Sequence, residues 1–231
     1  VPAEYCADRF IPSKNADGTY GVKACVAKVG STKYETLAEA IAAAKDGETV
    51  TLLDNITLTE QLVIGKNLTI DLGGFTLTSN YSLGASGANI YAIVLKAAVT
   101  IKNGKIVADN ARVIGAYGAM IMDGVTVENG IIGGHATIGL SGAGLEYVIR
   151  NSTINGAYSV AVFANNATVT IENSNITGRG PALYHNGSNY GLRLTVTDTT
   201  LTSAACSVYI SGSASMKDKA DNRNNADGYQ Q

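Results

Sequence analysis

The chain has 231 residues, of which 45% are hydrophobic and 16% charged, so it has the apolar content to fold and lacks the charge density of a disordered polypeptide. Its 17 basic and 19 acidic residues leave a formal net charge of −2, and no basic cluster offers an electrostatic footprint for nucleic acid. No apolar run reaches the roughly 20 residues needed to cross a bilayer, so membrane insertion is not expected.

The first expected element is a β-hairpin within residues 10–23, with Asp17 and Gly18 at its turn, because Asp-Gly favours the positive φ angles of tight hairpins. Cys6 and Cys25 flank this hairpin, and the sequence leaves two alternatives open: a disulfide across the hairpin base, or two free thiols. The three cysteines and two histidines of the chain show no metal-ligand spacing, so no metal site is expected.

The only clear helix signal runs from Thr36 to about Lys45. Thr36 and Glu39 have the spacing of a capping box, and Gly47 follows as a stop signal. After Gly47 the chain is rich in Thr, Val, Ile and Asn, with strand-like alternation broken by Gly, Asn, Asp or Ser. This pattern predicts an all-β fold with a single short helix. The apolar face of the helix is formed by Leu37, Ala40, Ile41 and Ala44.

The predicted strands recur as an internal repeat, in which an Asn or Asp follows one apolar residue by two positions and precedes another by three. Clear copies lie at 101–106, 149–154, 171–176 and 196–201, and weaker ones at 70–75 and 121–127. From residue 101 onward the spacing is roughly 20 to 28 residues, close to the coil length of a parallel β-helix. A second apolar strand precedes each copy, at 91–95, 112–114, 136–140, 159–163, 181–184 and 207–210. Two strand series in constant phase predict a parallel β-helix.

The repeated Asn or Asp is interpreted as a structural ladder formed by Asn103, Asp123, Asn151, Asn173 and Asp198. Asn tolerates the left-handed backbone of a tight bend, and amide side chains of coils stacked about 4.8 Å apart can hydrogen-bond along the stack. Ca²⁺ binding is the competing interpretation, but it needs several converging carboxylates, and the ladder supplies only two. No cofactor is therefore expected, with Ca²⁺ as the minor alternative.

The stacked coils resemble the right-handed parallel β-helix of the pectin-lyase-like superfamily. Residues 29–58 are similar to the start of the β-helix in large extracellular proteins of Gram-positive, often intestinal, bacteria, and the resemblance as a whole covers about residues 10–212. It implies a secreted or cell-wall-attached monomeric module of a longer chain. A helix laid across the end of the coils would hide strand edges and core. The expected organisation is a hairpin segment (1–30), a capping-helix region (31–47), the β-helix (48–215) and a polar tail (216–231).

Polysaccharide lyases and hydrolases share this fold, so whether the chain is catalytic depends on the individual residues that it carries. Hydrolysis needs two carboxyl groups roughly 5 to 9.5 Å apart, and the sequence has no Asp-Asp pair. His135 lies in a Gly-His-Ala triplet that only partly matches the Gly-His-Gly of polygalacturonases. A Ca²⁺-dependent lyase needs a carboxylate cluster and a base, whereas the candidate acids fall on different turns: Asp109, Asp123, Glu146, Glu172 and Asp198. No catalytic residue is assigned.

Tyrosines recur near the start of the second strand series, and rings with polar tips suit both sugar faces and protein interfaces. The alternative interpretation is that these rings cap the core or stack as a ladder. The candidate binding residues, with the histidines expected at the surface, are Tyr91, Arg112, His135, Tyr158, Tyr184 and His185. The sequence therefore predicts a non-catalytic, adhesin-like module that binds a host protein or glycan along the side of the β-helix. A polysaccharide lyase or glycoside hydrolase and a structural stalk are the alternatives.

Overall fold

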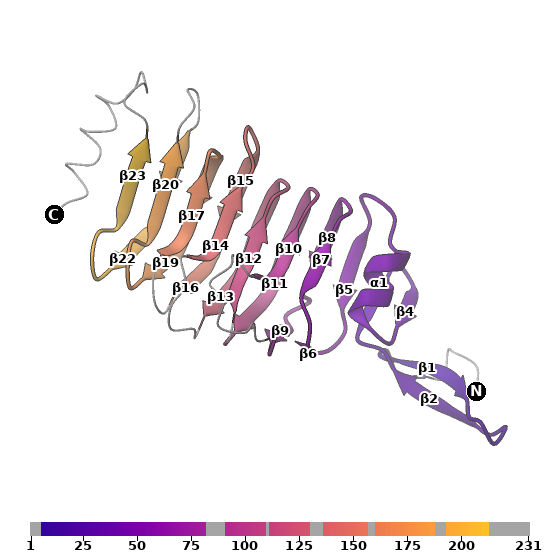
Figure 1. Ribbon diagram of the computed structural model, residues 1–231. Coiled ribbons are helices and arrows are strands. Elements are labelled where there is room, and N and C mark those ends of the chain that lie inside the picture. Colours follow the sequence, from indigo (N-terminus) through magenta and orange to yellow (C-terminus); the bar gives the residue numbers. More distant parts are fainter. Residues whose placement is uncertain are drawn as a thin grey trace.

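The computed structural model describes residues 6–81, 91–109, 111–129, 136–156, 160–187 and 193–212. In this part of the chain, short strands wind into a parallel β-solenoid of about 6 turns, and α1 (Leu37–Ala43) is the one helix. Figure 1 shows the coils stacked in chain order, with α1 and the hairpin of β1 (Phe10–Lys14) and β2 (Tyr20–Ala24) at the N-terminal end. The predicted all-β parallel β-helix with an N-terminal helix and hairpin is confirmed.

Three stacks of parallel strands form the walls of the solenoid. Wall A is a 7-stranded sheet of β7 (Leu62–Ile64), β10 (Tyr91–Leu95), β12 (Arg112–Ala116), β14 (Ala136–Ser141), β17 (Val160–Asn165), β20 (Leu183–Gly187) and β23 (Val208–Gly212). Wall B consists of β5 (Thr49–Leu52), β8 (Leu68–Asp71), the first halves of β11 (Val99–Ala108) and β13 (Met120–Asn129), β15 (Glu146–Arg150), β18 (Thr168–Glu172) and β21 (Leu194–Thr197). Wall C consists of β6 (Ile56–Leu58), β9 (Thr76–Ser79), the second halves of β11 and β13, β16 (Thr153–Gly156), β19 (Asn175–Gly178) and β22 (Thr200–Ser203).

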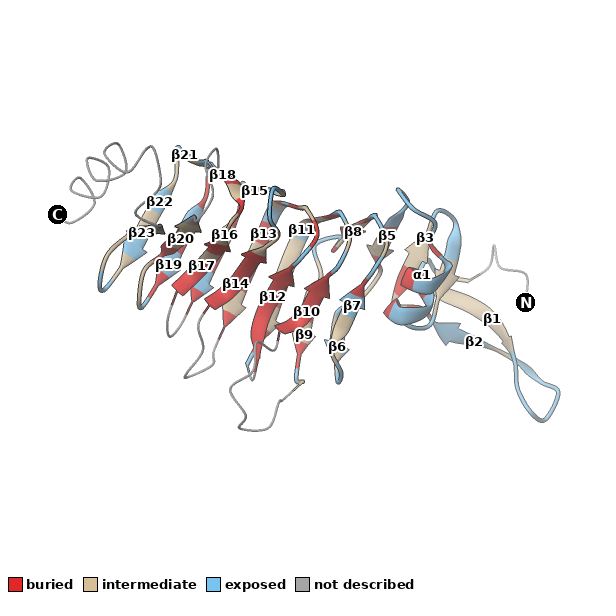
Figure 2. Ribbon diagram, turned by 45° about the horizontal axis from the view of Figure 1, so that its top comes forward, coloured by how far each residue is buried: buried red, intermediate tan, exposed pale blue. Residues whose placement is uncertain are grey.

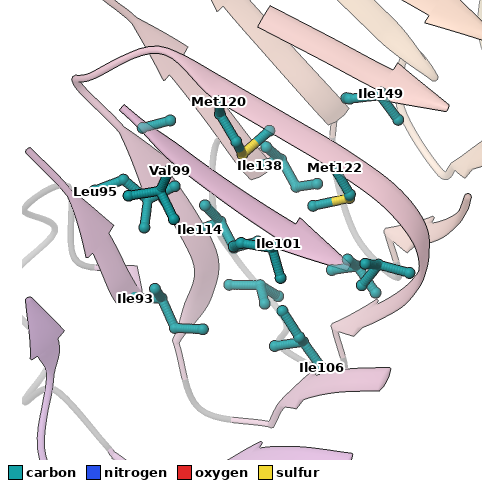
Figure 3. Packing of buried hydrophobic residues seen from close by; sticks show 14 of the residues in the cluster. Ile93, Leu95, Val99, Ile101, Ile106, Ile114, Met120, Met122, Ile138 and Ile149 are labelled. Carbon is teal, nitrogen blue, oxygen red and sulfur yellow. The ribbon is translucent and has the colours of Figure 1, made fainter. Parts of the chain in front are cut away.

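The core is a set of apolar rows that run along the stack between the walls. Parallel pairing places equivalent residues of successive coils above one another, so Ile101 of β11 lies in register with Met122 of β13. Figure 3 shows Ile93, Ile114 and Ile138 of wall A directed toward these wall B side chains. In Figure 2, β10, β12 and β14 are coloured as buried along most of their length, which places the most enclosed part of the solenoid at its middle coils.

The helix is stabilised by hydrogen bonds to the backbone groups at both of its ends. The backbone N–H of Glu39 donates to Thr36 Oγ1 at 3.1 Å, and the N–H of Thr36 donates to Glu39 Oε2 at 3.0 Å, which is the predicted capping box. At the other end, Lys66 Nζ donates to the carbonyl oxygens of Ala42 at 2.6 Å and Ala44 at 2.9 Å. These bonds satisfy carbonyls that the end of a helix leaves without partners.

The N-terminal end of wall B is covered by added strands. β3 (Ala27–Val29) pairs antiparallel with β5 on one side and with β4 (Thr32–Tyr34) on the other. The buried face of α1, formed by Leu37, Ala40 and Ile41, belongs to the same core cluster as the first coil. As a result Val50, in the first strand of wall B, is 0% exposed. This arrangement protects a strand edge that would otherwise be open to pairing with another chain.

No disulfide joins Cys6 and Cys25. The hairpin register pairs Phe10 with Ala24, and the N–H of Cys25 donates to the carbonyl of Arg9 at 2.7 Å. Arg9, and not Cys6, therefore lies across from Cys25 at the hairpin base. The disulfide alternative of the sequence analysis is wrong for this reason. Burial raises the pKa of the Cys25 thiol.

Candidate functional site

The bend between walls B and C carries the Asn and Asp residues of the repeat. Asp123 is an exception, because in its coil the left-handed position is taken by Gly124, with a φ of 65°. Asp123 lies one residue earlier, paired in the strand with Lys102 and Arg150. The other four residues of the predicted ladder adopt the left-handed backbone, with φ between 44° and 59°: Asn103, Asn151, Asn173 and Asp198.

Side-chain hydrogen bonds run along this bend from coil to coil. Asn151 Nδ2 donates to Asp123 Oδ1 at 2.7 Å, and Asn173 Nδ2 donates to Asn151 Oδ1 at 2.8 Å. Asn103 Nδ2 donates to Asp71 Oδ1 at 3.2 Å. Each of these side-chain amides therefore donates a hydrogen bond to the neighbouring coil, so its role is structural.

A row of alternating charge lies beside the bend on the outside of wall B, which sequence reasoning missed. Lys102 Nζ is 3.2 Å from Asp71 Oδ2, and Arg150 Nε is 2.9 Å from Asp123 Oδ2. The hydrogen bond from Asn151, followed by the bond and charge of Arg150, lowers the pKa of Asp123 despite some burial. Burial alone would raise the pKa of Asp71, but hydrogen bonds, including one from Lys102, outweigh it and lower the pKa.

These acids are therefore matched by basic neighbours and do not converge on one point. The described residues contain no group of three or more His, Cys, Asp or Glu side chains placed to hold a metal ion.

Tyr91 and Arg112, the first residues of β10 and β12 in wall A, form a packed pair. The two residues are in register, the guanidinium carbon of Arg112 lies 5.6 Å from the Tyr91 ring centroid, and their exposures are 6% and 8%. The ring crosses the next two strands over Gly115 and Gly139. A Cβ at Gly115 would lie 2.8 Å from the ring Cγ, and one at Gly139 would lie 2.7 Å from Cζ. Both distances are too short for a carbon contact, so the Tyr91 ring fits here only because the two positions are glycine. The structure thus brings these two predicted binding residues together, but largely beneath the surface.

Farther along wall A, the same outward row carries three aromatic side chains, here called the aromatic strip: Phe163, Tyr184 and Tyr209. The Phe163 and Tyr184 rings are 5.0 Å apart with an interplanar angle of 84°, and the Tyr184 and Tyr209 rings are 4.8 Å apart at 87°. Such edge-to-face pairs are favourable beyond their buried area. Tyr209, at the end of the strip, is 48% exposed.

A polar row, here called the amide row, runs beside the aromatic strip and consists of Asn165, Asn186 and Ser211. Asn186 Nδ2 donates to Asn165 Oδ1 at 3.1 Å, and Ser211 Oγ donates to Asn186 Oδ1 at 3.1 Å. Ser211 Oγ is also 3.1 Å from Tyr184 Oη, which ties the two rows together. The two rows together present ring surface next to amide and hydroxyl groups, a combination that suits the apolar face and the hydroxyls of a sugar.

His185 lies inside the solenoid, so its expected surface position is wrong. It is 4% exposed, pairs in register with Ala164 and Ile210, and its Nε2 lies 2.9 Å from the carbonyl oxygen of Ala167. Strand alternation is the reason, because the preceding Tyr184 points outward. The other two candidates, His135 and Tyr158, fall outside the described residues.

A hollow of about 370 Å³ opens on the outside of wall C. Asp109 and Glu128 both line it, and Glu128 is ion-paired with Lys105 at 2.8 Å. Glu128 was missed by sequence reasoning: aligning Asp123 with Asn103 pairs Glu128 with Ala108, whereas the structure is shifted by one residue in this coil and pairs Glu128 with Val107. The remaining lining residues are Val107, Asn129, Asn155, Gly156 and Thr177.

No model of a protein family matches this chain, and neither curated proteins nor solved structures give a match. None of the described helices has the length and apolarity to cross a membrane. The geometry of the outer surfaces is therefore the main evidence on function.

Proposed function

We propose that this chain is a non-catalytic, adhesin-like module of a bacterial surface protein that binds a glycan, free or carried on a host protein, along the outside of wall A. The observation that carries the proposal is the aromatic strip with the amide row beside it. An extracellular location and a place in the pectin-lyase-like superfamily form part of the proposal, supported by the solenoid architecture and by the resemblance of residues 29–58 to the start of such β-helices.

The chemistry of the strip suits a sugar better than a charged ligand. Aromatic rings on three successive coils offer an extended apolar row with alternating ring orientation, and the neighbouring amide and hydroxyl groups can exchange hydrogen bonds with sugar hydroxyls. The positions of the strip and the amide row carry no charged side chain. The rings already pack against one another on adjacent strands, so few side chains need to be ordered when a ligand binds. The entropy cost of binding is smaller for such a preorganised surface.

A glycan array tests this function. Wild-type chain should give saturable retention on a subset of glycans, and Tyr209→Ala should weaken it by about tenfold, the loss expected when an exposed binding ring is removed. Tyr20→Ala is the matched control, because Tyr20 is 64% exposed but lies in the N-terminal hairpin. Tyr209→Phe keeps the ring and should retain most of the binding. Equal retention by the Tyr209→Ala and wild-type chains would refute the strip as the binding surface.

The hollow on wall C supports a second candidate, cleavage of a polysaccharide by the Asp109 and Glu128 carboxyl groups. Incubation with polyuronides and neutral glycans, with and without Ca²⁺, would release shortened or unsaturated products, and Glu128→Gln would abolish them. Products that persist in Glu128→Gln would exclude this site. If neither binding nor turnover is observed, the stalk alternative is favoured.

A further inference from the structure

The two ends of the solenoid differ in how far the core is covered. The inner row of wall B begins at Val50, which is 0% exposed beneath β3 and α1, and no residue of the row is more than 2% exposed as far as Ile171 in β18. At the last coil Val196, the next residue of the row, is partly exposed. The same holds for three more core residues of that coil, Leu194, Leu201 and Ile210, whereas Val208 in β23 stays buried at 7%. This surface, formed by the last strands of the three walls, β21, β22 and β23, is here called the open end; Figure 1 shows it opposite the hairpin.

The strand edges of the open end are unpaired within the described part of the chain, since β21, β22 and β23 each pair only with the preceding coil. The carbonyls of Arg193, just before β21, and Thr197, at its end, accept bonds from the N–H groups of Val169 and Asn173 on the preceding coil. The backbone groups of the intervening Leu194 and Val196 consequently point away from β18, toward the open edge. An edge of this kind is a template for another strand.

The residues that directly follow β23 are poorly suited to cover this end. Residues 213–231 contain Met216 and Tyr229 as their only large apolar side chains, among many Asp, Asn, Lys and Gln. A cover for the open end needs an apolar face, as α1 has at the other end. The composition of 213–231 therefore argues against these residues as the cover.

The charges that flank β21 are complementary to a second copy of themselves. Arg193 directly precedes the strand and Asp198 directly follows it, both are exposed, and neither side chain has a hydrogen bond or ion pair in the described part of the chain. If β21 pairs antiparallel with β21 of a second copy and the pairing is centred on Thr195, Leu194 of each chain lies opposite Val196 of the other. This pairing also places Arg193 one residue from Asp198 of the second copy, and the two-fold axis repeats this contact.

We propose that the open end is a self-association surface, through which two chains join tail to tail by antiparallel pairing of β21 and two Arg193–Asp198 ion pairs. A two-fold contact uses the same patch on both chains and closes after two. Such a contact covers both open ends and leaves the α1 ends outside. The dimer departs from the monomeric module expected from the sequence.

Sedimentation velocity and light scattering on the 231-residue chain test this assembly. The wild type should form a species of about twice the 23.8 kDa chain mass, in a concentration-dependent and salt-sensitive manner. Arg193→Glu should raise the dimer Kd by about tenfold or more, because it puts two carboxylates together at each ion-pair position. Lys14→Glu makes the same charge change in the hairpin and should leave the dimer intact. Far-UV circular dichroism should match across all three chains, which would show that the fold is kept, while the loss of dimer in Arg193→Glu can lower its melting temperature.

Several outcomes would overturn the proposal. These are a wild type that stays monomeric at every concentration, a dimer that Arg193→Glu leaves unchanged, or an open series of larger species, which would indicate head-to-tail contacts. A chain truncated after Gly212 that dimerises when the full chain does not would show that residues 213–231 cover the open end themselves.

Discussion

Asn151 allows the contribution of the ladder to be separated into backbone and side-chain parts. Its φ of 52° lies in the left-handed region, its side-chain Nδ2 donates to Asp123 Oδ1 at 2.7 Å, and its side-chain Oδ1 accepts from Asn173 Nδ2 at 2.8 Å. Left-handed backbone costs a residue with a Cβ roughly 1 to 2 kcal/mol, and each side-chain hydrogen bond contributes about 0.5 to 1.5 kcal/mol, with the lower values for exposed groups. We therefore expect Asn151→Ala to lower the free energy of unfolding by about 2 kcal/mol and Asn151→Gly by about 1 kcal/mol, because glycine removes only the side-chain part.

Urea denaturation of both variants measures this difference, and melting temperatures should fall by about 2 to 4 °C per kcal/mol. Asn175→Ala is the matched control, since Asn175 is exposed on wall C and is not in the left-handed region, and it should stay within about 0.5 kcal/mol of wild type. Equal stability of the Ala and Gly variants would refute the backbone part of the argument. If both variants had wild-type stability, the ladder would contribute nothing.

Three further predictions concern packing, pH and capping. Gly139→Ala should cost about 1 to 3 kcal/mol by crowding the Tyr91 ring, and the cost should disappear in a Tyr91→Ala background, as a double-mutant cycle would show. Asp71 and Asp123 have lowered pKa values when folded, so the stability they contribute is fully present above their unfolded pKa and is lost as the pH falls through the folded pKa. Asp123→Asn should flatten that acid limb in denaturation midpoints measured against pH. Thr36→Ala should cost about 1 kcal/mol in urea denaturation by removing the helix cap; an unchanged midpoint would contradict the capping argument.

The architecture could be predicted because it depends on short sequence patterns that recur in each coil. The apolar positions around Asn151 and Asn173 recur with the period of one coil, and in-register stacking converts that period directly into walls and core rows. The capping box at Thr36 is equally local, and the structure contains it where the spacing indicates.

The candidate surfaces were harder to predict, because they depend on contacts between coils. The burial of Tyr91 depends on glycines one and two coils away, at positions 115 and 139. Phe163 joins the aromatic strip only through the register of β17 with β20, and the recurrence of tyrosines in the sequence does not include it. His185 points inward because of its place in the strand alternation, which a shift of one residue would reverse.

The most direct test of the proposed function is a titration of one array-selected glycan against wild type, Tyr209→Ala and Tyr20→Ala by isothermal calorimetry. We expect saturable binding by wild type and Tyr20→Ala with equal Kd, and at least about tenfold weaker binding by Tyr209→Ala with an unchanged far-UV circular dichroism spectrum. Equal Kd values for all three chains would place the binding surface elsewhere and contradict the account.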